Sequence, residues 1–153
     1  MKKNKKKFLY LISPNKIKSV FYKDLIDVLK SKKVSFFQLR LKKVAFKNRI
    51  KIAKKIKTIC QKYRVKFLIN DDPLLAQRVQ ADGCHLGQKD MNIKNARKIL
   101  KKKIIGVTCH NSLKLAELAI KDRADYVAFG AFNSSKTKKV KNISFYILKD
   151  KIF

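Results

Sequence analysis

The chain has 153 residues, 46% of them hydrophobic, which is enough apolar material for one domain with its own core. Lys and Arg number 40 against 10 Asp and Glu, so the formal net charge is +30. This charge favours anionic partners, namely nucleic acid, an acidic membrane surface or phosphorylated small molecules. Only six of the basic residues are Arg, the better reader of phosphates and base edges. The lysines are spread over nearly every expected helix, which indicates a biased composition more than a binding face.

Cysteine usage and the amino-terminal segment bear on the compartment. Cys60, Cys84 and Cys109 are odd in number and far apart, which argues against a disulfide framework and fits a reducing environment. The basic start precedes an apolar run, residues 8–12, that is too short for an export segment and ends at Pro14. No stretch approaches membrane-spanning length. We therefore expect a cytoplasmic protein without a membrane partner.

Strand-like runs alternate with amphipathic helical patterns along the chain. Strands are expected at residues 8–12, 34–41, 65–69, 84–86, 103–109 and 126–132. Helices are expected at residues 20–30, 46–63, from 73 onward, 92–100, 112–121 and 143–153. Strands that alternate with helices predict a parallel sheet, either open and doubly wound or closed into a (β/α)8 barrel. No glycine-rich loop follows the first strand, which disfavours a nucleotide-binding Rossmann unit.

The segment spanning residues 65–90 reads as strand, helix, strand. Its first strand stops before Asp71 and Asp72, and Pro73 suits the first turn of a helix with Asp72 as N-cap. After the second strand comes Asp90. Two carboxylates, Asp71 and Asp90, are thus expected near the same edge of a parallel sheet, where they could hold a cation.

Polar side chains follow the other expected strands at their carboxyl ends as well. They are Gln38, Arg40 and Lys42 after the second strand, Asn70 after the third, residues 85–90 at the fourth, Thr108 after the fifth, and residues 134–138 after the sixth. Alternation along residues 34–41 places Gln38 and Arg40 on one face of the strand. A barrel keeps its chemistry at this edge, so the pattern predicts ligands for anions and cations there.

Five segments match, in order and spacing, the motifs of thiamine-phosphate synthases. They are QLRLK (38–42), LINDD (68–72), ADGCHLGQKD (81–90), IIGVTCH (104–110), and ADYVAFGAF with SKTK (124–132 and 135–138). The chain resembles this family over residues 8–138, and the related thiazole tautomerases share the fold. The resemblance implies a TIM (β/α)8-barrel domain over residues 1–153, incomplete after about six units, with strands 7 and 8 missing. Its first and sixth strands would be open edges and a route to self-association.

The resemblance also implies an activity and a set of site residues. Such enzymes join 4-amino-2-methyl-5-(diphosphooxymethyl)pyrimidine to thiazole phosphate, forming thiamine phosphate and releasing pyrophosphate with the help of Mg²⁺. By the family's pattern, the pyrimidine diphosphate would be held by Gln38, Arg40, Lys42 and Asn70, and the Mg²⁺ by Asp71 and Asp90. Thr108 would lie beside the leaving group and Lys138 on the pyrophosphate. Ser135 and Thr137 would lie on the thiazole phosphate side. Fixed positive charge from Arg40, Lys42 and Lys138 would favour the transition state as the leaving oxygen becomes negative.

Other functions remain open on the sequence alone. An inactive or binding-only relative, or a protein like the thiazole tautomerases, would share the fold. Retention of the diphosphate-binding set favours the synthase, because the tautomerases tend to lose it. A basic nucleic-acid-binding domain would need aromatic stacking groups beside an Arg-rich face, and the aromatics here lie in apolar strand and helix patterns.

Single residues also have simpler structural interpretations. Asp71 and Asp72 could both be helix caps, and Gln38 and Arg40 could be paired polar groups inside a barrel. His85 is expected to be a structural hydrogen bonder. The pairs Cys84-His85 and Cys109-His110 suggest zinc, but adjacent residues on a strand point to opposite faces and cannot easily share an ion.

Overall fold

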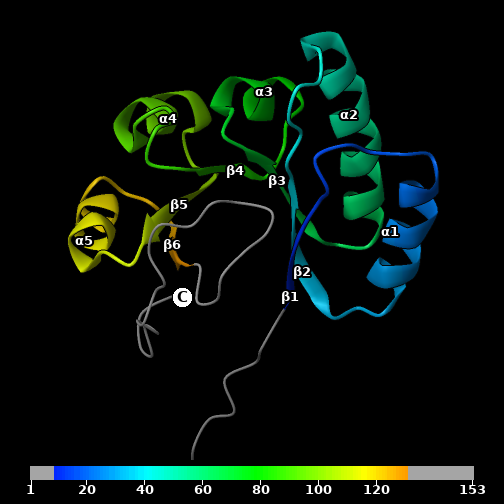
Figure 1. Ribbon diagram of the computed structural model, residues 1–153, viewed down its shortest axis with the longest axis horizontal. Helices are drawn as coiled ribbons and strands as arrows, with labels where there is room; N and C mark the ends of the chain where they lie inside the picture. Colours follow the sequence, from blue (N-terminus) through cyan, green and yellow to red (C-terminus); the bar gives the residue numbers. More distant parts are fainter. Residues whose placement is uncertain (1–8, 131–153) are drawn as a thin grey trace, which may run out of the picture.

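The computed structural model describes residues 9–130, which form a single parallel sheet of six strands in the order β1-β2-β3-β4-β5-β6. The strands are β1 (Leu9–Ile12), β2 (Val34–Leu39), β3 (Lys66–Asn70), β4 (Gly83–Leu86), β5 (Ile104–His110) and β6 (Tyr126–Phe129). The sheet curves into an arc, and the helices line its outer side (Figure 1). The described residues therefore form part of a β/α barrel, as the alternating pattern predicted.

Each helix connects two consecutive strands. The helices are α1 (Val20–Lys30), α2 (Phe46–Lys62), α3 (Pro73–Arg78), α4 (Ile93–Leu100) and α5 (Leu113–Lys121). On α2, Ala53, Ile56 and Cys60 recur at helical spacing and are fully buried. They join a core that includes Phe67 of β3, whose ring stacks on that of Phe37 at 6.4 Å between centroids. No helix among residues 9–130 is long and apolar enough to cross a membrane.

Three helix starts carry side-chain caps that the sequence encodes directly. Asp72 Oδ1 accepts the Leu75 N–H at 2.8 Å, and Asn92 Oδ1 accepts the N–H of Asn95 at 2.9 Å. Ser112 Oγ caps α5 in the same way. Each cap satisfies a backbone donor that the first helical turn leaves unpaired. The predicted starts of these helices are therefore confirmed.

β3 and β5 each end one residue later than predicted, at Asn70 and His110, and the ends of β2 and β6 differ more. β2 ends at Leu39, because the Arg40 N–H is bonded by Ser13 Oγ at 2.9 Å instead of continuing the ladder with β1. The prediction that strand alternation extends to Arg40 is therefore wrong. β6 is described to Phe129. Residue 8 of the expected first strand, residues 131–132 of the expected sixth strand and the expected helix at 143–153 lie outside the described residues.

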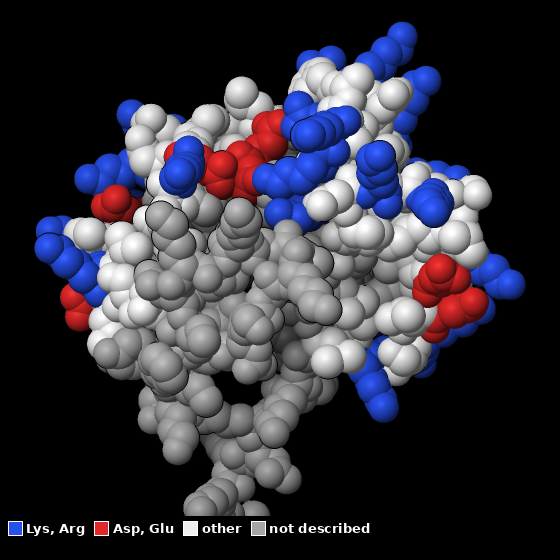
Figure 2. Space-filling model, in the orientation of Figure 1, with Lys and Arg blue, Asp and Glu red and all other residues white. Residues whose placement is uncertain are grey.

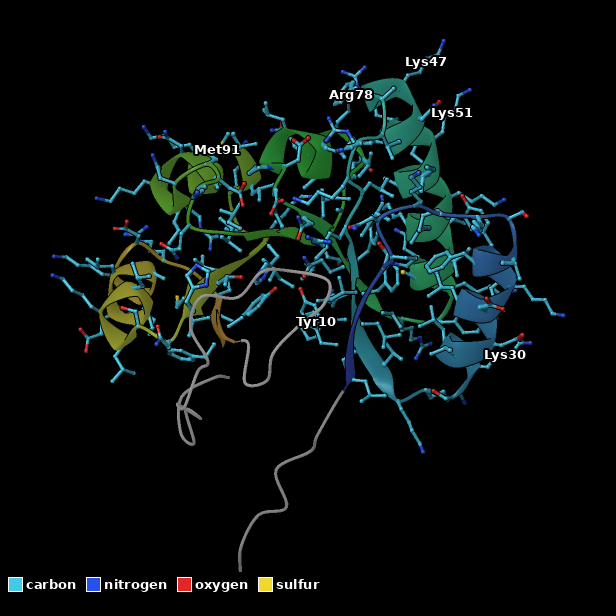
Figure 3. All side chains as sticks on the ribbon, in the orientation of Figure 1. Tyr10, Lys30, Lys47, Lys51, Arg78 and Met91 are labelled. Atoms are coloured by element: carbon cyan, nitrogen blue, oxygen red, sulfur yellow. The ribbon has the colours of Figure 1, made fainter. Side chains whose placement is uncertain are left out.

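Charge is distributed unevenly over the face shown in Figure 2. Lys and Arg are scattered around its periphery, whereas acidic side chains gather beside basic ones in its upper centre. Lys47 and Lys51 of α2 and Arg78 of α3 point outward at the end of the molecule where α2 begins (Figure 3). This scatter fits the composition-based interpretation of the lysines better than a single basic face.

Candidate active site

Six polar side chains, one from each strand, form a continuous set of hydrogen bonds. They are Tyr10 (β1), Gln38 (β2), Asn70 (β3), His85 (β4), Thr108 (β5) and Tyr126 (β6). We call this set the six-strand chain. Tyr10 points from β1 into the space that the curved sheet partly encloses (Figure 3). Its hydroxyl oxygen lies 2.7 Å from that of Tyr126, so the two outermost strands are linked through their side chains.

One half of the six-strand chain runs through the first three strands. The Tyr10 hydroxyl donates to Gln38 Oε1 at 2.8 Å, and Gln38 Nε2 donates to Asn70 Oδ1. Gln38 is only 3% exposed, and both ends of its amide are bonded. A buried amide without partners would cost free energy, so these bonds explain how a polar side chain is tolerated inside the sheet.

The other half centres on His85. Its Nδ1 lies 2.8 Å from Tyr126 Oη, and its Nε2 lies 2.8 Å from Thr108 Oγ1. His85 is thus a hydrogen bonder, as the sequence indicated. Burial raises the pKa of Tyr10 to about 12, and burial likewise raises the pKa of Tyr126, so both phenols are neutral at physiological pH.

The predicted carboxylate pair meets just above this layer, at the carboxyl edge of the sheet. Asp71 follows β3 with a positive φ of 63°, and its Oδ2 lies 3.0 Å from Lys42 Nζ. Asp90 Oδ2 accepts the Gly87 N–H at 2.7 Å. Burial raises the pKa of Asp90, and a side-chain hydrogen bond and like charge from Asp71 raise it further, against the Gly87 bond and Lys42. The carboxyl groups of Asp71 and Asp90 therefore interact directly at the β3–β4 edge.

Asp72 has a different role from its neighbour. One of its oxygens caps α3, and the other forms an ion pair with Arg49 Nη1 at 2.9 Å. Because Asp71 adopts the left-handed backbone conformation, the two consecutive carboxylates take separate sets of partners. The cap interpretation, which the sequence left open for both, thus applies to Asp72.

Arg40 lies at the β1–β2 side of the same edge. Its Nη1 donates to Asn15 Oδ1, and its backbone is held by Ser13. Among the other predicted site residues, Gln38, Asn70 and Thr108 share the six-strand chain, and Lys42, Asp71 and Asp90 form the charged group. Ser135, Thr137 and Lys138 lie outside the described residues.

Three residues of the site received no role of their own from the sequence: Tyr10, Tyr126 and Gln88. Tyr10 and Tyr126 lie in apolar strand patterns. Gln88 Nε2 donates to the backbone oxygen of Thr108 at 2.6 Å, which ties the β4 loop to β5. The available signal was a phenol hydroxyl on a strand that also carries inward polar groups, because a buried hydroxyl requires a partner.

The donor set suits a hard cation better than zinc. Residues 9–130 contain no group of three or more His, Cys, Asp and Glu side chains placed to hold an ion. Asp71 and Asp90 supply two carboxylates, and Mg²⁺ is commonly held by one or two carboxylates with substrate phosphates and water completing its shell. Burial first, and then a hydrogen bond and like charge from Asp71, raise the pKa of Asp90, and a divalent cation beside both carboxylates would offset these effects. The residues present therefore fit Mg²⁺.

A parallel β/α arc with acidic and basic side chains at the carboxyl ends of its strands has the architecture of a β/α-barrel enzyme, whose chemistry lies at that edge. Residues 9–145 match the thiamine monophosphate synthase family. The chain belongs to this family, whose curated members similar to this chain are named thiamine-phosphate synthase, a transferase of thiamine biosynthesis.

Individual relatives agree with this assignment. The thiamine-phosphate synthase of Pelagibacter ubique is 69% identical over 144 residues, covering 92% of this chain and 70% of the relative. That of Erythrobacter litoralis is 44% identical over 133 residues, covering 85% and 62%. The structure of thiamine phosphate pyrophosphorylase from Pyrococcus furiosus superposes with a TM-score of 0.74 at 30% identity, covering 82% of this chain and 61% of that one. The chain thus spans about two thirds of the length of these relatives, and the incomplete TIM-like barrel fold is confirmed. Together they support a synthase over the other functions that the sequence left open.

Proposed function

We propose that this chain condenses 4-amino-2-methyl-5-(diphosphooxymethyl)pyrimidine with thiazole phosphate to form thiamine phosphate and pyrophosphate. The observation that carries the proposal is the meeting of Lys42, Asp71 and Asp90 at the carboxyl edge, next to the six-strand chain. The charged side chains at the edge can bind a diphosphate, while the neutral donors and acceptors of the six-strand chain can bind a heterocycle. The family assignment supplies the identity of both substrates.

The diphosphate end of the substrate is bound by the cationic side of the edge. Arg40 and Lys42 both follow β2, and each already holds an oxygen, from Asn15 and Asp71 respectively. A substrate oxygen can replace these partners, so both cations are presented without a change of fold. Their charge stabilises the leaving oxygen as it becomes negative, which lowers the barrier to loss of pyrophosphate.

Asp71 and Asp90 hold Mg²⁺ in this proposal. When bound, the ion neutralises the diphosphate and so makes pyrophosphate a better leaving group. Asp71 contributes by its fixed backbone: φ of 63° and the bond from its N–H to the His85 carbonyl at 2.8 Å aim its carboxylate away from α3. The Gly87 N–H orients the Asp90 carboxylate by donating a hydrogen bond to its Oδ2. Neither side chain needs to transfer a proton.

The pyrimidine diphosphate is bound by Gln38 and Asn70, whose amides are bonded to each other, and by Thr108, which is bonded to His85 in the six-strand chain. Ser135 and Thr137 on the thiazole phosphate side and Lys138 on the pyrophosphate complete the proposed set. Bond formation then needs mainly the placement of the thiazole nitrogen against the activated carbon.

Two further elements of the proposal concern the protein's surroundings. Within the described residues β1 pairs with β2 alone and β6 with β5 alone, and Leu9 and Ile12 of β1 are about half exposed. These edges support association with a second copy of the chain. Three free, buried cysteines support a cytoplasmic location, where thiols stay reduced.

The test is synthesis of thiamine phosphate by the purified chain with both substrates and Mg²⁺, followed by chromatography. Asp71→Asn and Asp90→Asn should each lower kcat/KM by roughly 10²-fold, because each removes charge from the ion's shell. Asp27→Asn is the matched control, since Asp27 pairs with Lys30 on the exposed face of α1. Absence of product from the wild-type chain, or equal losses in all three variants, would overturn the proposal.

A further inference from the structure

The partners in the six-strand chain determine where its protons lie. Gln38 Oε1 can only accept, so the single Tyr10 hydroxyl proton is donated to it. The bond between Tyr10 and Tyr126, 2.7 Å long, must then use the proton of Tyr126. With its own proton engaged, Tyr126 Oη can only accept from His85 Nδ1 at 2.8 Å.

The same counting continues to β5. In its neutral form the His85 imidazole carries one N–H; the Tyr126 acceptor places it on Nδ1, so Nε2 is then an acceptor. Thr108 Oγ1, 2.8 Å away, therefore donates its proton to Nε2. The hydrogen bonds of the six-strand chain therefore all run in one direction. Each is donated toward Asn70, beginning at Thr108 and passing through His85, Tyr126, Tyr10 and Gln38.

The fold makes room for Tyr126 in a specific way. His85, Gly106 and Tyr126 lie in register on β4, β5 and β6. A Cβ on Gly106 would come 1.9 Å from Cζ of Tyr126, so the ring crosses β5 only because this residue has no side chain. The Tyr126 and His85 rings lie 5.6 Å apart between centroids. Tyr10 is held on the other side by stacking on Phe36 at 5.7 Å.

We infer that Tyr126 is a positioning residue: its hydroxyl fixes the proton of His85 on Nδ1 and thereby makes Thr108 a hydrogen-bond acceptor toward the substrate. The functional half of this inference rests on the proposed function. A diphosphate oxygen offers no proton, whereas the amino group of the pyrimidine does. Thr108 therefore pairs with the heterocycle rather than with the leaving group.

The proton position is read from the imidazole ¹⁵N resonances of the free, full-length protein, because a protonated ring nitrogen resonates far upfield of a bare one. The chain has two histidines, and a His110→Gln variant assigns the signals. We expect the N–H of His85 on Nδ1 in the wild type and in Thr108→Val, which keeps the Tyr126 acceptor. In Tyr126→Phe the preference should be lost and the Nε2–H form should appear.

Tyr63→Phe is the matched control, because it removes a phenol hydroxyl outside the six-strand chain and should leave the His85 signals unchanged. A second readout is kinetic: Tyr126→Phe should raise KM for the pyrimidine diphosphate about fivefold, the effect of one lost hydrogen bond, and leave kcat within about twofold. Thermal unfolding checks that each variant is folded.

A His85 proton on Nε2 in the wild type would overturn the inference even if Tyr126→Phe fails to fold. The inference would also be overturned if the His85 proton left Nδ1 in Thr108→Val but stayed there in Tyr126→Phe. An unchanged KM for the pyrimidine diphosphate in Tyr126→Phe would overturn it as well. The ¹⁵N measurement needs no turnover, so a chain without synthase activity would refute the proposed function and leave the proton position to be decided by the spectrum.

Discussion

Replacing Asp72 by Ala should destabilise the protein without touching the charged group of the site. Asp72 Oδ1 caps α3 through the Leu75 N–H at 2.8 Å, and Oδ2 pairs with Arg49 Nη1 at 2.9 Å. Its neighbour Asp71 makes neither bond and lies beside Lys42. The two carboxylates are adjacent in sequence, yet the structure separates their roles completely.

The magnitude follows from the two lost interactions. Loss of an N-cap costs about 1 kcal/mol of unfolding free energy. The Asp72–Arg49 pair is partly exposed, with side-chain exposures of 23% and 29%, so its loss adds at most about 1 kcal/mol. A total of about 2 kcal/mol corresponds to a fall in Tm of about 4–8 °C for a chain of this size.

Asp72→Asn divides the effect, because Asn is an equally good N-cap but carries no charge. It should lose about half of that stability or less, and its kcat/KM should stay near the wild-type value. Differential scanning calorimetry gives Tm, and the thiamine phosphate assay gives activity. An unchanged Tm in Asp72→Ala, or an Asp72→Asn variant as inactive as Asp71→Asn, would show that the roles are assigned wrongly.

Two more predictions test the packing around the sheet. Gly83→Ala should be strongly destabilising, because a Cβ there would lie 2.0 Å from the Ile104 backbone oxygen where β4 meets β5. Urea unfolding should show a midpoint well below that of the wild type. An unchanged midpoint would contradict the close approach. Burial raises the pKa of Cys60 to about 12 and that of Cys109 to about 11, and it also raises the pKa of Cys84, so the thiolate fraction at pH 8 is very small. The native chain should therefore resist a thiol-disulfide reagent that labels all three thiols in denaturant. Rapid labelling of the native chain would contradict their burial.

Much of the fold could be predicted because its signals are local. Apolar spacing on α2, with Ala53, Ile56 and Cys60, is a property of consecutive residues, and so are the caps at Asp72 and Asn92. Parallel strands joined by helices then bring all carboxyl ends to one edge. The order of elements and the meeting of Asp71 with Asp90 were accordingly foreseen from the pattern.

The remaining features depend on contacts between distant parts of the chain. The end of β2 is set by the Ser13 side chain, which lies on another strand's loop and has no signature near Arg40. Likewise the choice between Asp71 and Asp72 depends on a single positive φ and on Arg49, 23 residues earlier. Propensity and periodicity carry no information on such partners.

Sequence alone determined the alternation of parallel strands with helices over the described residues, and the placement of Asp71 and Asp90 at the carboxyl edge of the sheet. Only the tertiary structure decided that Tyr10 and Tyr126, 116 residues apart, meet and join all six strands in one run of hydrogen bonds. The physical reason is that a buried hydroxyl must find a partner, and which partner it finds depends on the curvature of the sheet and on the empty space at Gly106.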